Sequence, residues 1–256
     1  MPEAETMTGP EDTTDFGYRE VPRGEKKQHV GAVFSSVAPR YDLMNDLMSL
    51  GIHRLWKCFC LELLDVRPGQ QVLDLAGGTG DFSLALAARV GPGGRVLLCD
   101  INAAMLAQGR DRLLDAGLCS EVAIVRADAE RLPFVTASLD RVVMAFGLRN
   151  VTDKAAALAE CRRVLRPGGL LAVLEFSRPV IAPLRTLYDA WSFAVIPRLG
   201  RLITGDEASY RYLVESIRRH PDQDVLAGMF REAGLERVDV HNLSGGIVAL
   251  HRGWAL

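Results

Sequence analysis

The sequence predicts an α/β fold built on a mostly parallel, seven-stranded sheet. Between Val72 and Phe176, short apolar stretches alternate with stretches of helical spacing, a pattern typical of a parallel sheet with helices on both faces. Glycine-rich turns separate several of these stretches, as expected where strands end. The length of 256 residues, 48% of them hydrophobic, suits one large domain with a sizeable core.

The first 67 residues are expected to lie outside this sheet. Residues 1–25 hold seven carboxylates against two arginines and predict a mobile acidic tail. Residues 26–67 have leucines at helical spacing, interrupted at Gly51, and predict a helical N-terminal cover.

Seven strands are expected, five in the alternating region and two near the end of the chain. The first five are predicted at residues 72–75, 95–100, 122–125, 139–146 and 170–176, with helices at 82–88, 103–114 and 154–165. Residues 178–220 interrupt the alternation, are rich in aromatic side chains, and predict a helical insertion after strand five. A last helix is predicted over residues 221–233, followed by a hairpin of strands at 238–242 and 247–251.

The composition argues against several classes of protein. Thirty Lys and Arg against 32 Asp and Glu give a formal net charge of −2, without the basic excess typical of nucleic-acid-binding proteins. We find no apolar run long enough for a membrane-spanning helix and no signal peptide, so we expect a cytoplasmic location. Five cysteines at irregular spacing, including Cys58 and Cys60, do not make a metal-binding pattern, and no metal is expected.

The strongest local motif follows the first strand of the predicted sheet. It is Asp74-Leu75-Ala76-Gly77-Gly78-Thr79-Gly80. Small residues there let the backbone turn sharply and let a ligand approach closely. Asp100 ends the next strand, where a carboxylate can accept hydrogen bonds from both hydroxyls of a ribose. We therefore expect an adenosine-containing cofactor at the carboxyl ends of the strands.

The spacing of the motif argues against a dinucleotide. The fingerprint G-x-G-x-x-G, counted from Gly78, requires a third glycine where the chain has Ser83. With Asp74 inside the strand, the segment instead resembles motif I of class I S-adenosylmethionine-dependent methyltransferases. The resemblance implies the Rossmann-like sheet of that class and S-adenosyl-L-methionine as cofactor. It places Asp74 near the methionine part of the cofactor and the loop beneath it, at Ala76, Gly78, Thr79 and Gly80.

Further segments resemble the same class. Asp128–Phe134 follows the third strand and is similar to the segment at the adenine edge, which implies that Asp128 accepts a hydrogen bond from the adenine amino group and that Ala129 offers its backbone amide. Arg166–Gly169 resembles the turn that precedes the fifth strand in many of these enzymes. Ala145 stands where many relatives have a serine next to the cofactor, so only a backbone contact is expected from it.

Longer strings resemble one family within this class, the ubiquinone/menaquinone C-methyltransferases. They are Tyr41–Ser49 with His53 and Trp56, Phe146–Asp153, Ser209–Leu213 with His220–Gln223, and Ala249–Gly253. The resemblance covers residues 26–256, which we expect to form one methyltransferase domain. It implies S-adenosylmethionine-dependent C-methylation of a polyprenylated quinol, either demethylmenaquinol to menaquinol or 2-polyprenyl-6-methoxy-1,4-benzoquinol to its methylated form.

The same resemblance places Tyr41, Arg149 and Asn150 around the acceptor ring. Arg149 is not expected to act as a base, because a guanidinium stays protonated; stabilising a phenolate or ordering a water suits it better. His53 is a candidate proton acceptor, because its ordinary pKa lies near 6.5, or else part of a helix that packs over the pocket.

Alternatives remain open at this stage. A methyltransferase for another phenolic or lipid acceptor is one, and a non-catalytic quinone-binding scaffold is another, against which the intact cofactor loop argues. The insertion at residues 178–220 is expected either to bind the prenyl tail and associate peripherally with the inner face of the membrane, or to form a solvated helical lid. A homodimer and a quinone-biosynthesis complex are both compatible with the sequence.

Overall fold

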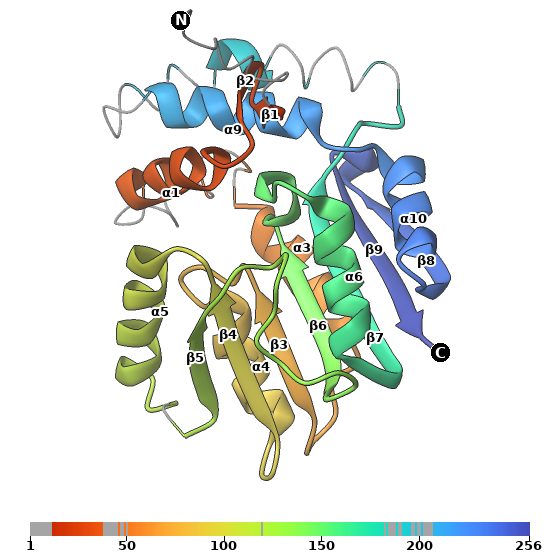
Figure 1. Cartoon of the computed structure of the whole chain (residues 1–256). Coiled ribbons are helices and arrows are strands. Elements are labelled where there is room, and N and C mark those ends of the chain that lie inside the picture. The colour runs from red at the N-terminus through yellow and green to blue at the C-terminus, as the bar shows by residue number, and fades with distance from the viewer. Residues whose placement is uncertain are drawn as a thin grey trace, which may run out of the picture.

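The structure is a computed structural model, and it describes residues 12–37, 46, 49, 51–118, 120–181, 183, 188, 191–195, 198, 201 and 207–256. Its centre is a seven-stranded sheet with the strand order β5-β4-β3-β6-β7-β9-β8 (Figure 1). This sheet confirms the predicted fold class and its expected seven strands.

Five strands of the sheet run parallel to one another. They are β3 (Gln71–Leu75), β4 (Arg95–Asp100), β5 (Val122–Arg126), β6 (Leu139–Ala145) and β7 (Leu165–Phe176). The remaining two, β8 (Glu236–Leu243) and β9 (Val248–Ala255), pair antiparallel across a 3-10 turn, η4, at Ser244–Gly246, which confirms the predicted hairpin.

Helices cover both faces of the sheet. One face carries α3 (His53–Leu63), α4 (Asp81–Val90) and α5 (Ala103–Asp115), and the other carries α6 (Lys154–Val164) and α10 (Gln223–Glu232). Successive side chains of a strand point to opposite faces, so Val72 joins the first of these cores and Leu73 the second. Three of these helices begin at side chains that cap free backbone N–H groups: Asn102, Asp153 and Asp222.

The start of strand five differs from the prediction. β7 begins at Leu165, so residues 166–169 lie inside the strand rather than in a turn before it. Leu165 pairs with Leu139, whereas Leu170 pairs with Arg141, so β7 carries extra residues between these two pairs. Gly168 adopts a φ of 81°, which accommodates this bulge without strain.

The N-terminal residues also differ from the prediction. β1 (Thr13–Phe16) and β2 (Arg19–Pro22) form an antiparallel hairpin, and α1 (Lys26–Val37) follows it. Phe16 is buried and stacks on Tyr212, with the ring centroids 4.3 Å apart. The mobile tail predicted for residues 1–25 is therefore wrong for residues 12–25, because one buried aromatic side chain anchors an otherwise acidic segment.

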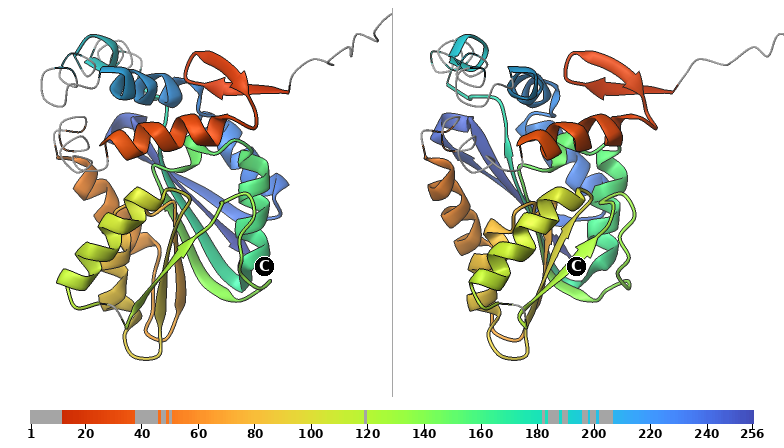
Figure 2. Two further views of the ribbon diagram at one scale, coloured as in Figure 1. Left: turned by 60° about the vertical axis from the view of Figure 1, so that its left-hand side comes forward. Right: turned by 90° about the vertical axis from the view of Figure 1, so that its left-hand side faces the viewer.

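The predicted insertion at residues 178–220 contributes η3 (Trp191–Val195) and α9 (Glu207–Arg219) to the described part of the chain. Figures 1 and 2 show α9, the β1–β2 hairpin and α1 together above the end of the sheet where the parallel strands end. We call these four elements, β1, β2, α1 and α9, the top layer. Within the described residues, no helix is both long enough and apolar enough to cross a membrane.

Candidate active site

A cavity of about 790 Å³, counted with its opening to solvent, lies between the sheet and the top layer. Ala76, Asp100, Asp128 and Gly147 line it from the ends of β3, β4, β5 and β6, and α1 contributes lining from above. These four strands adjoin in the order β5-β4-β3-β6, which spans about 15 Å at the usual strand spacing. An elongated ligand lying along this edge therefore contacts each strand end in turn.

The glycine-rich turn after β3 leaves no room for a side chain at Gly77. A Cβ on Gly77 would lie 2.5 Å from Cδ1 of Leu98 and 2.7 Å from the carboxylate of Asp74. Gly78 has a φ of 56° and donates its N–H to Asp100 at 3.0 Å. The turn therefore presents bare backbone to the cavity, as a closely approaching ligand requires.

Asp100 is suited to hold a ribose. Its two carboxylate oxygens accept one backbone N–H each, from Gly78 at 3.0 Å and from Asn102 at 2.8 Å. Burial raises the pKa of Asp100, while these N–H donors oppose the shift. A carboxylate offers about four acceptor positions, so both oxygens keep capacity for the hydroxyls of a ribose.

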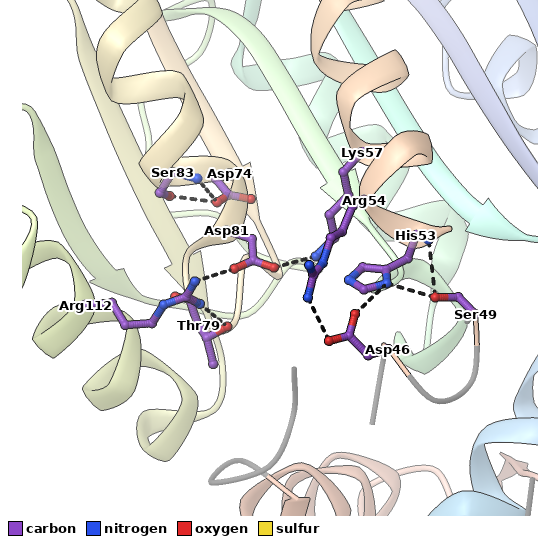
Figure 3. A network of polar contacts seen from close by, with 10 residues as sticks. All are labelled: Asp46, Ser49, His53, Arg54, Lys57, Asp74, Thr79, Asp81, Ser83 and Arg112. Carbon is purple, nitrogen blue, oxygen red and sulfur yellow. Dashed lines mark hydrogen bonds and ion pairs between the residues drawn. The ribbon is translucent and has the colours of Figure 1, made fainter. Parts of the chain in front are cut away.

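Asp74 is fully buried beneath the glycine-rich turn. Its Oδ2 accepts the backbone N–H of Ser83 at 2.9 Å and the Ser83 hydroxyl at 2.7 Å, as Figure 3 shows. Burial raises the pKa of Asp74 to about 6, although the Ser83 hydrogen bonds and the charge of Lys57 act against that shift. Asp74 thus shapes the turn from behind and adds a titratable negative charge near it.

A lysine from the top layer contacts the segment that follows β5. Lys27 of α1 binds Oδ2 of Asp128 at 2.5 Å and Oε2 of Glu130 at 2.9 Å. Burial lowers the pKa of Lys27, but the hydrogen bonds and charges of both carboxylates outweigh burial and raise it overall. Glu130 also accepts the backbone N–H groups of Thr152 and Asp153, each at 3.1 Å, so one carboxylate joins α1 to the loop after β6.

An ionic cluster beside the glycine-rich turn connects three helices (Figure 3). Asp81, the first residue of α4, pairs with Lys57 of α3 at 2.6 Å and with Arg112 of α5 at 2.7 Å. Arg112 also donates to the carbonyl and hydroxyl oxygens of Thr79, both at 3.0 Å. Thr79 therefore helps to fix the turn through Arg112.

His53 lies at the start of α3, close to this cluster (Figure 3). Its Nδ1 is 2.8 Å from the Ser49 hydroxyl and 3.8 Å from a carboxylate oxygen of Asp46. Burial, followed by the positive charge of Lys57, lowers the pKa of His53. The imidazole is consequently neutral near pH 7 and able to accept a proton.

Arg149 is buried in an ion pair rather than directed at the cavity. Only 4% of Arg149 and 1% of Glu175 are exposed, and Nη1 of Arg149 lies 3.0 Å from Oε1 of Glu175. Glu175 also accepts the backbone N–H groups of Arg149 at 3.2 Å and Phe176 at 2.9 Å. The pair clamps the short turn η2 (Leu148–Asn150) to the end of β7.

The predicted site residues fall into three groups. Those that line the cavity are Ala76, Gly78, Asp100, Asp128, Ala129 and Asn150. Those that lie outside its described lining are Asp74, Thr79, Gly80, Ala145, Arg149 and His53. Tyr41 lies outside the described residues.

Sequence reasoning did not identify several residues that hold the site together. They are Lys27, Asp81, Asn102, Glu130, Glu175 and Tyr212. Asn102 and Glu130 each lie two positions beyond a predicted site residue, so the local sequence offered a signal for both. Lys27 and Tyr212 reach the site from distant helices. No local pattern points to Lys27, and the family-like string Ser209–Leu213, which contains Tyr212, has no predicted role in the site.

Solved structures share this fold. A SAM-dependent methyltransferase from Aquifex aeolicus aligns with a TM-score of 0.58 and 18% identity, covering 78% of this chain and 89% of that one. Phosphoethanolamine N-methyltransferase 2 of Haemonchus contortus, in complex with S-adenosyl-L-methionine, aligns with a TM-score of 0.54 and 17% identity, covering 73% of this chain and 38% of that one. These structures show that the chain has the class I methyltransferase fold.

Sequence comparison narrows the class to one family. A model of the ubiE/COQ5 methyltransferase family matches residues 23–255. Two proteins named ubiquinone/menaquinone biosynthesis C-methyltransferase UbiE are close relatives. The one from Coxiella burnetii (strain RSA 331 / Henzerling II) is 56% identical over 97% of this chain and 99% of its own, and the one from Stutzerimonas stutzeri (strain A1501) is 58% identical over 95% of each. The chain belongs to the ubiE/COQ5 methyltransferase family.

Proposed function

We propose that this protein transfers a methyl group from S-adenosylmethionine to a ring carbon of a polyprenylated quinol in menaquinone or ubiquinone biosynthesis. The observation that carries the proposal is the cavity between the sheet and the top layer, whose lining includes Asp100, Asp128 and Asn150. Phe34 and Phe146 give it apolar walls suited to a quinol ring. Relatives that match nearly the whole chain carry the name of this reaction.

The residues of the site fit the cofactor part by part. When bound, S-adenosylmethionine supplies an electrophilic sulfonium methyl group. Asp100 would accept from the ribose hydroxyls, Asp128 would accept from the adenine amino group, and Ala129 would offer its backbone amide. Asp74, buried behind the turn, would contribute a negative charge that favours the cationic methionine part.

We propose that Asn150 is the residue that directly contacts the ring oxygen of the quinol. A deprotonated quinol hydroxyl donates electron density to the neighbouring ring carbon. This carbon attacks the methyl group and forms the new C–C bond. The S–C bond breaks at the same time, and the electron pair of that bond stays on sulfur. Loss of the proton from that carbon restores the aromatic ring. An amide N–H aimed at the phenolate oxygen stabilises the charge that drives this attack. Arg149 and Glu175 hold the turn that carries Asn150.

We propose that His53 takes up the proton that the quinol releases. Its imidazole is neutral near pH 7, because burial and the charge of Lys57 lower its pKa. We assign the hydrogen of the neutral ring to Nδ1, which donates to the Ser49 hydroxyl, so that Nε2 can take the proton. We propose that a water carries the proton to His53, because His53 lies outside the described lining of the cavity.

We further propose that the protein associates peripherally with the membrane, because its substrate carries a prenyl tail. Ile52, Leu55 and Phe59 are 41%, 69% and 38% exposed and follow one side of α3 at helical spacing. Co-sedimentation with liposomes should fall for Leu55→Glu. It should stay unchanged for Leu114→Glu, a control at an exposed leucine of α5. Equal sedimentation of both variants would remove this part of the proposal.

Light scattering tests for a homodimer, and pull-down with other quinone-modifying enzymes tests for a complex.

The proposed reaction is tested with chemically reduced and oxidised acceptors. The purified protein is incubated with S-adenosylmethionine and short-chain demethylmenaquinol or methoxy-benzoquinol, and products are identified by mass spectrometry. We expect a methylated product only from the reduced acceptor, and none from the Asp100→Ala variant. If the protein binds S-adenosylmethionine but methylates neither quinol, the acceptor assignment is wrong.

A further inference from the structure

Tyr212 belongs to the string Ser209–Leu213, to which the reaction so far assigns no role. It lies on α9 in the top layer, is 7% exposed, and packs over η2. Its hydroxyl donates to Oδ1 of Asn150, with 3.1 Å between the two oxygen atoms. Tyr212 is thus the point where the top layer reaches the side chain proposed to touch the acceptor.

With Tyr212 as the donor, this hydrogen bond sets which end of the Asn150 amide faces the ligand. A carboxamide has one acceptor oxygen and an NH2 group that only donates. With the oxygen turned to the Tyr212 hydroxyl, the NH2 group remains for the cavity, which Asn150 lines. The opposite orientation would set the carbonyl oxygen against an anionic ring oxygen and repel it. Burial raises the pKa of Tyr212, so its hydroxyl keeps the proton that it donates.

Both partners of this hydrogen bond are held in place by other contacts. The Tyr212 ring stacks on Phe16 of β1, with centroids 4.3 Å apart and an angle of 21° between the ring planes. The backbone of the turn that carries Asn150 is fixed at Arg149, whose N–H donates to Glu175 at 3.2 Å. A rigid donor on one side and a rigid turn on the other leave the amide little freedom to rotate.

We propose that Tyr212 is a positioning residue that orients the Asn150 carboxamide so that its NH2 group donates to the ring oxygen beside the methylated carbon. The inference rests on the proposed quinol methylation. Because Tyr212 stands on α9 and stacks on Phe16 of the β1–β2 hairpin, presentation of the N–H donor depends on the packing of the top layer.

The test is a double-mutant cycle on the full chain. Tyr212→Phe removes only the hydroxyl and keeps the stacking on Phe16, and Asn150→Ala removes the amide. With saturating S-adenosylmethionine and a reduced short-chain quinol, we expect kcat/KM to fall about 100-fold for Asn150→Ala, the usual loss for one oxyanion donor, and about tenfold for Tyr212→Phe. The double variant should match Asn150→Ala, because Tyr212 acts through Asn150. The Kd for S-adenosylmethionine should stay within about twofold.

Two further readouts separate positioning from a merely structural role. Without the N–H donor the phenolate is less stabilised, so the rising limb of kcat/KM against pH should move to higher pH in both single variants. A loss of folded protein would lower the rate equally at every pH. Asn150→Asp keeps an acceptor for Tyr212 but no N–H donor, and should be as impaired as Asn150→Ala.

Several outcomes would overturn the inference. They are full activity of Tyr212→Phe, additive losses in the double variant, or wild-type rates for Asn150→Asp. If Tyr212→Phe does not fold, the comparison of Asn150→Asp with Asn150→Ala decides instead, together with their pH profiles. A wild-type protein that binds S-adenosylmethionine but methylates no quinol overturns the proposed function and this inference together, which distinguishes that failure from failure of the inference alone.

Discussion

The loops at the strand ends and the top layer line the same cavity, but they are held together differently. In the loops, contacts join adjacent strands, as when Gly78 after β3 donates to Asp100 at the end of β4. In the top layer, the contacts join residues far apart in the chain: Lys27 and Asp128 are 101 positions apart, and Arg23 and Asp153 are 130 apart. The floor of the site is thus fixed by the sheet itself, whereas its closure depends on a few long-range contacts.

We expect the largest effect from a substitution that breaks the attachment of the top layer. Phe16→Ala removes the ring that stacks on Tyr212 and should cost about 3 kcal/mol in the free energy that holds the hairpin closed. Trypsin should then cleave faster after Arg19 and Arg23, and the Kd for S-adenosylmethionine should rise. Val135→Ala, at an exposed position, is the matched control and should change neither. Unchanged cleavage of Phe16→Ala would contradict the role of this contact.

The next effect tests the floor of the site. Gly77→Ala places a Cβ 2.5 Å from Leu98 and 2.7 Å from the Asp74 carboxylate, so the turn must shift. We expect affinity for S-adenosylmethionine, measured by calorimetry, to fall about 100-fold, because the backbone approach is lost. Gly228→Ala, in α10 with open space around it, serves as control and should leave affinity unchanged. Equal affinities in the two variants would show that the turn is not part of the binding surface.

Titration of Asp74 provides a third comparison, because the floor carries a charge that pH can remove. Burial raises the pKa of Asp74 to about 6, so below that pH the carboxyl is protonated and must lose its proton before it can attract a cationic cofactor. The Kd should therefore rise by up to about tenfold per pH unit below 6. Asp74→Asn should bind more weakly at pH 7 and flatten this dependence. A steep dependence that survives in Asp74→Asn would move the titrating group elsewhere.

The raised pKa of Asp74 affects the stability of the ligand-free protein in the opposite direction: this stability falls as pH rises, whereas cofactor binding strengthens. A carboxyl whose pKa is raised in the folded state contributes most stability below its unfolded pKa and loses that contribution as pH rises through about 6. The increase in Tm on adding S-adenosylmethionine should accordingly be small at pH 5 and larger at pH 7.

The smallest expected effect concerns the contact between the two regions. Lys27→Met removes the ion pairs to Asp128 and Glu130, which are partly exposed, and should weaken S-adenosylmethionine binding about threefold at low salt and less at high salt. Lys27→Arg should retain most of the affinity. If Lys27→Met binds the cofactor more tightly, Lys27 competes with the adenine for Asp128 rather than closing the site over it.

The floor of the site was largely predictable from the sequence, and the top layer was not. Strand ends and turns leave local signals: small residues at 76–80, and a carboxylate at Asp100 where a strand stops. Five of the nine predicted cofactor residues line the cavity: Ala76, Gly78, Asp100, Asp128 and Ala129. The other four, Asp74, Thr79, Gly80 and Ala145, lie outside its described lining. The hairpin at residues 13–22 leaves a weaker signal, because its anchor is one aromatic residue in a polar, acidic segment and its partner lies on α9.

Arg149 and Asn150 show a second limit of sequence reasoning. They are neighbours in one motif, and the resemblance assigns both to the acceptor ring. The structure separates them, because Asn150 lines the cavity whereas the guanidinium of Arg149 is buried against Glu175, 26 positions away. The way the turn is buried determines which of two adjacent polar residues faces a ligand. The spacing of residues in the sequence does not predict this.

The position of the transferred methyl group tests the central claim most directly. S-adenosylmethionine with a deuterated methyl group is reacted with reduced short-chain demethylmenaquinol whose reacting ring position carries deuterium, and the product is analysed by NMR and mass spectrometry. Methylation of a ring carbon should place the label on that carbon and release the ring deuterium to solvent. A label on oxygen with the ring deuterium retained would contradict the account and make the protein an O-methyltransferase.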